Sequence, residues 1–254
     1  MLKQNLIIEL RDKNSIFLEL KSSYFKKKVL YCTEISKEFI EIKNKSLYII
    51  IEGEEVYIKT LLIPNCSNDA VKRIICQELN ISLNNAENLT YSYKILSKTK
   101  NVLEILAFYL NSEKLAKLKV YNLNNNNKLK LINVIQFYIF NYYYKDIKEK
   151  VYLLAFAYNN NLYILGCNNN SVILNSLIKN YNSLDNVEKI ISLIHKNFRS
   201  INDNIIEKVY LVNLSGSKLL QELSEHYEVC DLGILSKEQL CKSILGNERY
   251  KWKN

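Results

Sequence analysis

Cysteine and histidine, the residue types that most often carry chemistry, do not form the pattern of a reactive or metal-binding site in this sequence. None of the six cysteines belongs to a C-x-x-C pair, and the only histidines are His195 and His226. Structural zinc sites and thiol redox motifs depend on such close spacing. A catalytic cysteine would need a base beside it to form the thiolate, and the sequence indicates none. We therefore expect neither a metal site nor a cysteine nucleophile.

The basic residues outnumber the acidic ones and give a formal net charge of +9. Such a charge is typical of nucleic-acid-binding proteins and of proteins that face anionic membranes. The lysines are scattered, apart from a cluster at Lys26–Lys28 and a smaller basic group at Arg249, Lys251 and Lys253. Because no zinc knuckle, arginine-rich helix or RNA-stacking motif accompanies them, we do not expect nucleic acid to be the partner.

Length and composition indicate a folded protein. The chain has 254 residues, of which 48% are hydrophobic and 24% charged, so wholesale disorder is excluded. It has no apolar run of about 18 residues, the length that a membrane-spanning helix needs. The first residues contain no apolar stretch of the kind found in signal peptides. We therefore expect a cytoplasmic protein.

Hydrophobic periodicity predicts an alternation of strands and helices in the first half of the chain. Residues 69–79 are expected to form an amphipathic helix, because Val71, Ile74, Ile75 and Leu79 share one face. A polar turn at 11–14 separates two β-type runs and predicts a hairpin. The predicted strands are 5–10, 15–20, 28–34, 38–42, 46–52, 56–62, 88–95 and 101–110, and the other predicted helices are 112–121 and 129–144.

The second half repeats this order. Three predicted strands at 151–157, 162–167 and 171–177 form a meander with asparagine-rich turns, and the rest alternates between helix and strand. The remaining predicted helices are 187–198, 218–226 and 237–243, and the remaining strands are 207–213 and 227–232. Three strands followed by alternating helices and strands, given twice, are typical of the α/β fold of actin and RNase H. We therefore predict two related blocks, residues 1–144 and 145–254.

The order of these segments resembles the PilM family of type IV pilus assembly proteins. These are actin-like proteins related to FtsA and to the cytoplasmic part of GspL. The first hairpin, from Ile8 to Leu20, is similar to a family opening that typically reads I-D-I-G-S-x-x-I-K-x-V-E-L. The other similar segments are Val56–Pro64 with the helix that ends at Leu79, Tyr91–Ile95, Tyr152–Leu165 and Val209–Ser217. By this resemblance, residues of about 55–120 form a small inserted subdomain.

The positions that would bind nucleotide in actin-like ATPases depart from the pattern that the resemblance implies. Glu9 stands where the first hairpin has Asp, and Arg11 stands where it has Gly, with Asp12 and Asn14 in the turn. The second hairpin has Ala155 and Ala157 in place of D-x-G. Alanine cannot bind magnesium, and its Cβ crowds a phosphate that glycine would admit.

Two further features bear on the nucleotide. The third phosphate segment keeps Ser215 and Gly216 but has Ser217 in place of a second glycine. The gap between the strand at 171–177 and the next helix is too short for the helical insertion that lines the adenosine pocket in the family. We therefore expect no cofactor and no enzymatic activity, in other words a pseudo-ATPase. The alternative is an ATP-binding protein, such as an FtsA-like filament protein or an enzyme of the sugar-kinase group.

The resemblance also implies a partner. PilM-like proteins are cytoplasmic scaffolds at the inner face of the membrane, where they bind the short cytoplasmic N-terminal peptide of the single-pass membrane protein PilN. The groove would lie between the inserted subdomain and the first block, and the helix predicted within 121–144 would form its second wall. Contacts with the pilus ATPase or other platform proteins, and a homo-oligomer, are compatible with this role. The groove residues expected from the strand at 56–63 and the helix at 68–79 are Tyr57, Lys59, Leu61, Ile63, Arg73 and Gln77.

Overall fold

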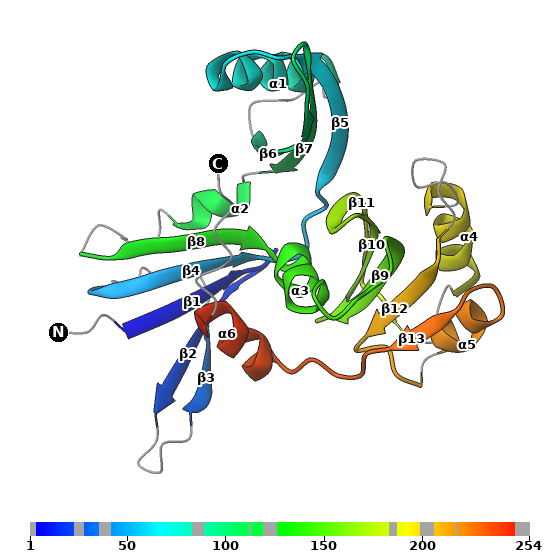
Figure 1. The fold of residues 1–254 in the computed structure, drawn as a ribbon. Helices are drawn as coiled ribbons and strands as arrows, with labels where there is room; N and C mark the ends of the chain where they lie inside the picture. Colours follow the sequence, from blue (N-terminus) through cyan, green and yellow to red (C-terminus); the bar gives the residue numbers. More distant parts are fainter. Residues whose placement is uncertain are drawn as a thin grey trace.

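In the part of the chain that the computed structural model describes, there are three β-sheets and six helices (Figure 1). Two sheets have five strands each, and a smaller sheet has three. Most of the predicted strand at 38–42 and most of the two basic clusters lie outside the described residues. The described residues are 4–22, 28–35, 42–82, 89–111, 113–118, 126–182, 187–198, 206–216 and 218–246.

The first five-stranded sheet has the order β3-β2-β1-β4-β8. The hairpin neighbours are antiparallel, whereas β4 runs parallel to β1 and β8 runs parallel to β4. The central strand β1 is buried from Leu6 to Leu10, as expected for a strand covered on both faces. The strands are β1 (Gln4–Leu10), β2 (Ser15–Ser22), β3 (Lys28–Ile35), β4 (Lys45–Ile51) and β8 (Lys128–Val134).

The second five-stranded sheet repeats this topology with the order β11-β10-β9-β12-β13. Again a meander of three antiparallel strands is followed by two parallel ones. One face of the sheet is covered by α4 (Val187–Phe198) and α5 (Lys218–Ser224). The strands are β9 (Val151–Tyr158), β10 (Asn161–Asn168), β11 (Ser171–Lys179), β12 (Lys208–Val212) and β13 (Val229–Asp231). The first and second blocks below are named after these two sheets.

The small sheet lies between β4 and β8 in the chain and is fully antiparallel, with the order β5-β7-β6. Its helix α1 (Asn68–Ser82) covers one face, with Val71, Ile75 and Leu79 buried as the periodicity predicted. The strands are β5 (Tyr57–Pro64), β6 (Leu89–Lys98) and β7 (Val102–Asn111), followed by the short helix α2 (Glu113–Ala116).

Two helices, α3 (Ile135–Tyr143) and α6 (Lys237–Gly246), pack against each other, and α3 lies between the two large sheets in Figure 1. The prediction of one helix over 129–144 is wrong in its first part, because residues up to Val134 form β8. Leu131 and Val134 fit a helical period together with Ile135. The lysine and leucine residues from Lys128 to Leu131 alternate instead with the period of two that is typical of a strand. None of the helices in the described residues combines the length and hydropathy of a membrane-spanning segment.

Candidate functional site

The hairpin turns that open the two blocks meet at one place. The first turn follows β1 and contains Arg11 and Asp12, and the second joins β9 to β10 and contains Asn159. The guanidinium of Arg11 donates a hydrogen bond to Oδ1 of Asn159 over 3.1 Å. Asn159 has a φ of 51°, a left-handed conformation that asparagine tolerates better than most residues. The two turns therefore touch through side chains.

Glu9 is the buried centre of the first group of contacts. Its carboxylate has no exposed surface and accepts hydrogen bonds from Nε of Arg11 over 2.6 Å and from the hydroxyl of Tyr158 over 2.9 Å. The amide of Asn159 donates a third over 3.1 Å. Burial, together with the charge of Glu9, holds the pKa of the Tyr158 hydroxyl well above its usual value. The hydroxyl therefore stays protonated and remains a donor.

Glu52, directly after β4, is the centre of a second group. Only 4% of it is exposed, and its carboxylate accepts hydrogen bonds from Asn161 over 2.5 Å and from the hydroxyl of Tyr163 over 3.3 Å. The N–H of Gly53 donates to the same hydroxyl over 2.8 Å. Gly53 has a φ of 73°, and an added Cβ would lie 3.2 Å from Nζ of Lys114. Glycine is therefore favoured here on both conformational and steric grounds.

Lys114 on α2 ties the inserted subdomain to the first turn. Its ammonium is 5% exposed and lies 2.6 Å from Asp12 and 3.0 Å from Glu54, and it also donates to the carbonyl oxygen of Glu52. Lys179 on β11 lies 3.3 Å from the other oxygen of Asp12. Burial would raise the pKa of Asp12, but the hydrogen bond and charge of Lys114 hold that pKa below its usual value. Asp12 is thus an ionised group with two cations beside it.

The predicted nucleotide positions fall into four places. Glu9, Arg11 and Asp12 belong to the contacts above, whereas Asn14 donates to Glu34 on β3. Ala155 is buried in the core beneath α4 and α5. The other three, Ala157, Ser215 and Gly216, line a polar hollow of about 670 Å³ at the ends of β9, β11 and β12, together with Asn159, Asn160, Asn180, Tyr181, Asn182, Asn213 and Leu214.

Sequence reasoning missed five residues of these contacts, because no local pattern marks them and only the fold brings them together: Glu52, Lys114, Asn161, Tyr163 and Lys179. Among the described residues, no group of three or more histidine, cysteine, aspartate or glutamate side chains could hold a metal ion. The carboxylates of Glu9 and Asp12 already have cationic partners from the chain itself.

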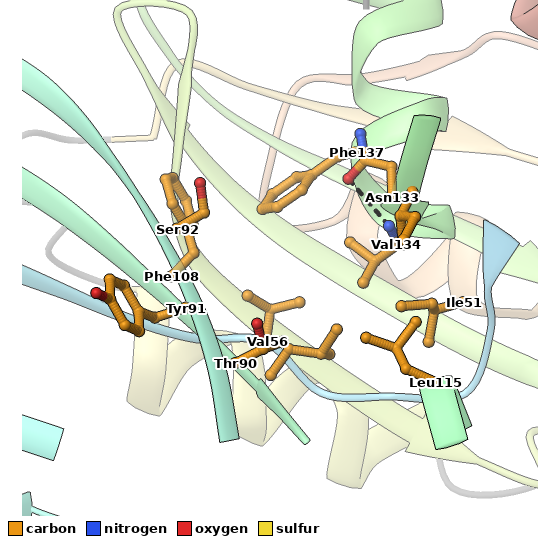
Figure 2. A pocket seen from close by; sticks show the side chains of 12 residues that line it. Ile51, Val56, Thr90, Tyr91, Ser92, Phe108, Leu115, Asn133, Val134 and Phe137 are labelled. Carbon is orange, nitrogen blue, oxygen red and sulfur yellow. Dashed lines mark hydrogen bonds between the residues drawn. The ribbon is translucent and has the colours of Figure 1, made fainter. Parts of the chain in front are cut away.

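A second feature is an apolar cavity of about 250 Å³ between the small sheet and the first block (Figure 2). Phe108 on β7 and Phe137 on α3 meet edge to face, with ring centroids 5.2 Å apart. Asn133 is 8% exposed, and its amide nitrogen has no hydrogen-bond partner among the described residues. The remaining lining residues are Ile51, Val56, Thr90, Tyr91, Ser92, Leu110, Leu115, Ile132 and Val134.

None of the six predicted groove residues lines this cavity. Leu61 and Ile63 pack on α1, and Lys59 pairs with Glu78 of that helix over 2.8 Å. Tyr57 on β5 and the α1 residues Arg73 and Gln77 are exposed. The four β5 residues have odd numbers and share the α1 face, because side chains alternate along a strand. The cavity lies on the other face of the small sheet. A role of the six residues in binding a peptide stays a prediction.

Glu52 should make stability depend on pH. Burial raises its pKa above 4.5, and the nearby charge of Glu9 adds to the effect. The folded protein then binds the proton more readily than the unfolded chain, so the free energy of unfolding falls as pH rises above about 4.5. We expect Glu52→Gln to remove this loss and to gain stability relative to the wild type between pH 5 and pH 8.

Urea denaturation at several pH values measures this effect, and the same substitution at the exposed Glu225 is the control. If the free energy of unfolding changed with pH in the same way for the wild type and Glu52→Gln, the folded protein would not raise the pKa of this carboxyl.

No protein-family model matches the chain, and no curated protein matches it in sequence. Solved structures do match. A Bacteroides thetaiotaomicron protein of unknown function with an actin-like ATPase fold covers 97% of this chain and 96% of its own, with a TM-score of 0.54 at 12% identity. The present chain has an actin-like fold. The predicted fold class is thereby confirmed.

Two further solved structures belong to secretion and pilus systems. A PilM–PilN type IV pilus biogenesis complex matches with a TM-score of 0.61 at 9% identity over 93% of both chains. The cytoplasmic domain of EpsL, an inner membrane component of the type II secretion system of Vibrio cholerae, matches with a TM-score of 0.53 at 8% identity over 96% of both chains. At these identities the likeness shows the fold alone.

Proposed function

We propose that this protein is a cytoplasmic scaffold of a type IV pilus or type II secretion platform, held at the inner face of the membrane by a partner similar to PilN. The observation that carries the proposal is the apolar cavity between the small sheet and the first block. It lies between the two parts that were expected to enclose the peptide groove. The likeness to the PilM–PilN complex supports a partner of this kind.

The walls of the cavity suit an extended apolar peptide. Its volume of about 250 Å³ is below the range of about 300–1,000 Å³ typical of small-molecule pockets, so a few side chains fit better than a whole cofactor. Within the described residues, β6 and β8 are the outermost strands of their sheets, and both contribute to the lining. Outermost strands can pair with an added strand. The unpartnered amide of Asn133 would gain a hydrogen bond from a peptide carbonyl oxygen, which removes the cost of leaving a buried donor unsatisfied.

We also propose that the chain does not hydrolyse ATP. Ala155 and Ala157 offer no ligand for magnesium, and the carboxylates of Glu9 and Asp12 are already paired with Arg11 and Lys114. A general base for hydrolysis would need a free acceptor next to the attacking water.

The polar hollow of about 670 Å³ favours the alternative, an ATP-binding actin-like protein such as a filament protein or a sugar-kinase-group enzyme. Its lining includes Ser215 and Gly216, the most family-like of the nucleotide positions. Thermal unfolding with and without MgATP separates the two proposals, because a ligand that binds only the folded state raises Tm.

The scaffold proposal predicts that Ile132→Asp abolishes peptide binding. Ile132 lines the cavity and is 37% exposed, so a carboxylate there should cost little stability but would be buried by an apolar peptide. The matched control is Leu129→Asp on the same strand, 51% exposed and away from the cavity. We expect a loss of about 100-fold or more for Ile132→Asp and less than about twofold for Leu129→Asp.

The experiment starts with co-purification from solubilised membranes of the source cells. A synthetic peptide of the recovered partner's cytoplasmic N-terminus is then titrated against the wild type, Ile132→Asp and Leu129→Asp. Recovery of no single-pass membrane protein with a short cytoplasmic N-terminus would contradict the scaffold proposal. Equal peptide binding by Ile132→Asp and Leu129→Asp would show that the peptide does not bind at this cavity.

A further inference from the structure

Four hydrogen bonds connect the first block to the hairpin β9–β10 of the second block. Two of them reach the carboxylate of Glu9 and two reach the carboxylate of Glu52. We propose that these contacts hold the two blocks closed permanently, without a bound nucleotide. We call them the cross-block network; it consists of Glu9, Glu52, Tyr158, Asn159, Asn161 and Tyr163.

The geometry of the cross-block network opposes opening. Glu9 lies near the carboxyl end of β1, and Glu52 directly follows the neighbouring parallel strand β4, so the two carboxylates face one hairpin from the same end of the first sheet. All four donors belong to that hairpin, and Tyr163 also accepts the N–H of Gly53. A hinge motion that separated the blocks would break these bonds together. Opening would exchange these donors for water, and because hydrogen bonds to charged groups contribute more to stability than neutral ones, losing four of them together disfavours the open state.

The inserted subdomain also contacts the region where the two blocks meet. Lys114 fixes the turn through Asp12 and fixes the segment after β4 through Glu54. The small sheet also reaches the second block directly, because Lys94 donates to the hydroxyl of Ser171 over 2.7 Å and β5 lies against β11. The first block, the second block and the inserted subdomain are thus joined at several separate points.

The inference does not depend on what occupies the apolar cavity. It predicts that the distance between the two hairpin turns is set by the protein itself, so a partner would meet one fixed surface. A nucleotide is not needed to bring the two blocks together, because the cross-block network already connects them.

Amide hydrogen exchange of the two hairpins tests the inference, because under native conditions exchange reports the opening equilibrium of each segment. Tyr163→Phe removes the hydroxyl that joins Glu52 and Gly53 to the second block. We expect the amides near 10–14 and 158–162 to exchange about tenfold faster in this variant, the change that follows from one lost buried hydrogen bond. MgATP at millimolar concentration should leave the wild-type rates unchanged.

The matched control is Tyr152→Phe. Tyr152 is fully buried in the same sheet, but its hydroxyl makes no hydrogen bond to the first block, and its ring contacts Tyr210. Because the ring of Tyr163 stacks on Phe156, a second variant uses the half-buried Asn161, changed to alanine. Equal exchange in Tyr163→Phe, Asn161→Ala and Tyr152→Phe would overturn the inference. So would marked slowing of wild-type exchange by MgATP, which would show that a nucleotide closes the molecule.

Discussion

Arg11→Ala should lower the free energy of unfolding by about 3 kcal/mol. Arg11 lies 2.6 Å from Glu9, whose carboxylate is completely buried. Truncating the arginine leaves that carboxylate in the interior without its nearest cation, and breaking a buried ion pair in this way typically costs about 3–5 kcal/mol. The lower end applies because Tyr158 and Asn159 still donate to Glu9.

Urea denaturation of three further variants isolates the buried charge as the cause. Lys242→Ala removes an exposed ion pair with Glu238 and should cost less than about 0.5 kcal/mol. Glu9→Gln combined with Arg11→Ala removes the buried charge at position 9, so the double variant should be more stable than Arg11→Ala alone. A loss below about 1 kcal/mol for Arg11→Ala would mean that the ion pair contributes little to the fold.

Phe137→Ala should have a comparable effect, also about 3 kcal/mol, for an apolar reason. The ring of Phe137 is 7% exposed, borders the apolar cavity and contacts Phe108 of the small sheet edge to face. Its removal deletes buried apolar surface and enlarges the cavity, and both changes destabilise a core. The ring contact is lost as well.

The control for Phe137→Ala is Ile234→Ala, at a side chain that is 76% exposed and should change stability by less than about 0.5 kcal/mol. Both are measured by urea denaturation monitored by circular dichroism. If Phe137→Ala cost no more than the control, the small sheet would not depend on α3 for its position.

Most of the secondary structure could be predicted from the sequence because its periodicity is unambiguous. The helix predicted at 187–198 is α4, and the predicted meander at 151–177 is β9 to β11. The segment of β8 begins with alternating lysine and leucine, but its apolar residues Leu131 and Val134 also fit the helical period of the residues that follow. This is why β8 was predicted as part of a helix, although the boundary at Ile135 separates the two elements.

The candidate sites were less accessible to sequence reasoning. Glu9, Arg11 and Asp12 could be singled out by position in a hairpin, but Lys114 reaches Asp12 across about a hundred residues of chain, and no local pattern marks it. The family resemblance implied that Tyr57, Lys59, Leu61 and Ile63 line a groove, because it placed their strand in one wall of that groove. The sequence shows that such residues share a face, but not which neighbour that face meets.

The path of α6 means that chain order and spatial division do not coincide in this protein. The chain completes the second sheet with β13 and then returns, so that Leu240, Cys241 and Ile244 are buried in a core shared with β1, β4 and α3. A fragment that ended between the blocks would lack part of the first core, and the complementary fragment would expose it. We therefore expect that the two blocks unfold together and that neither folds stably by itself.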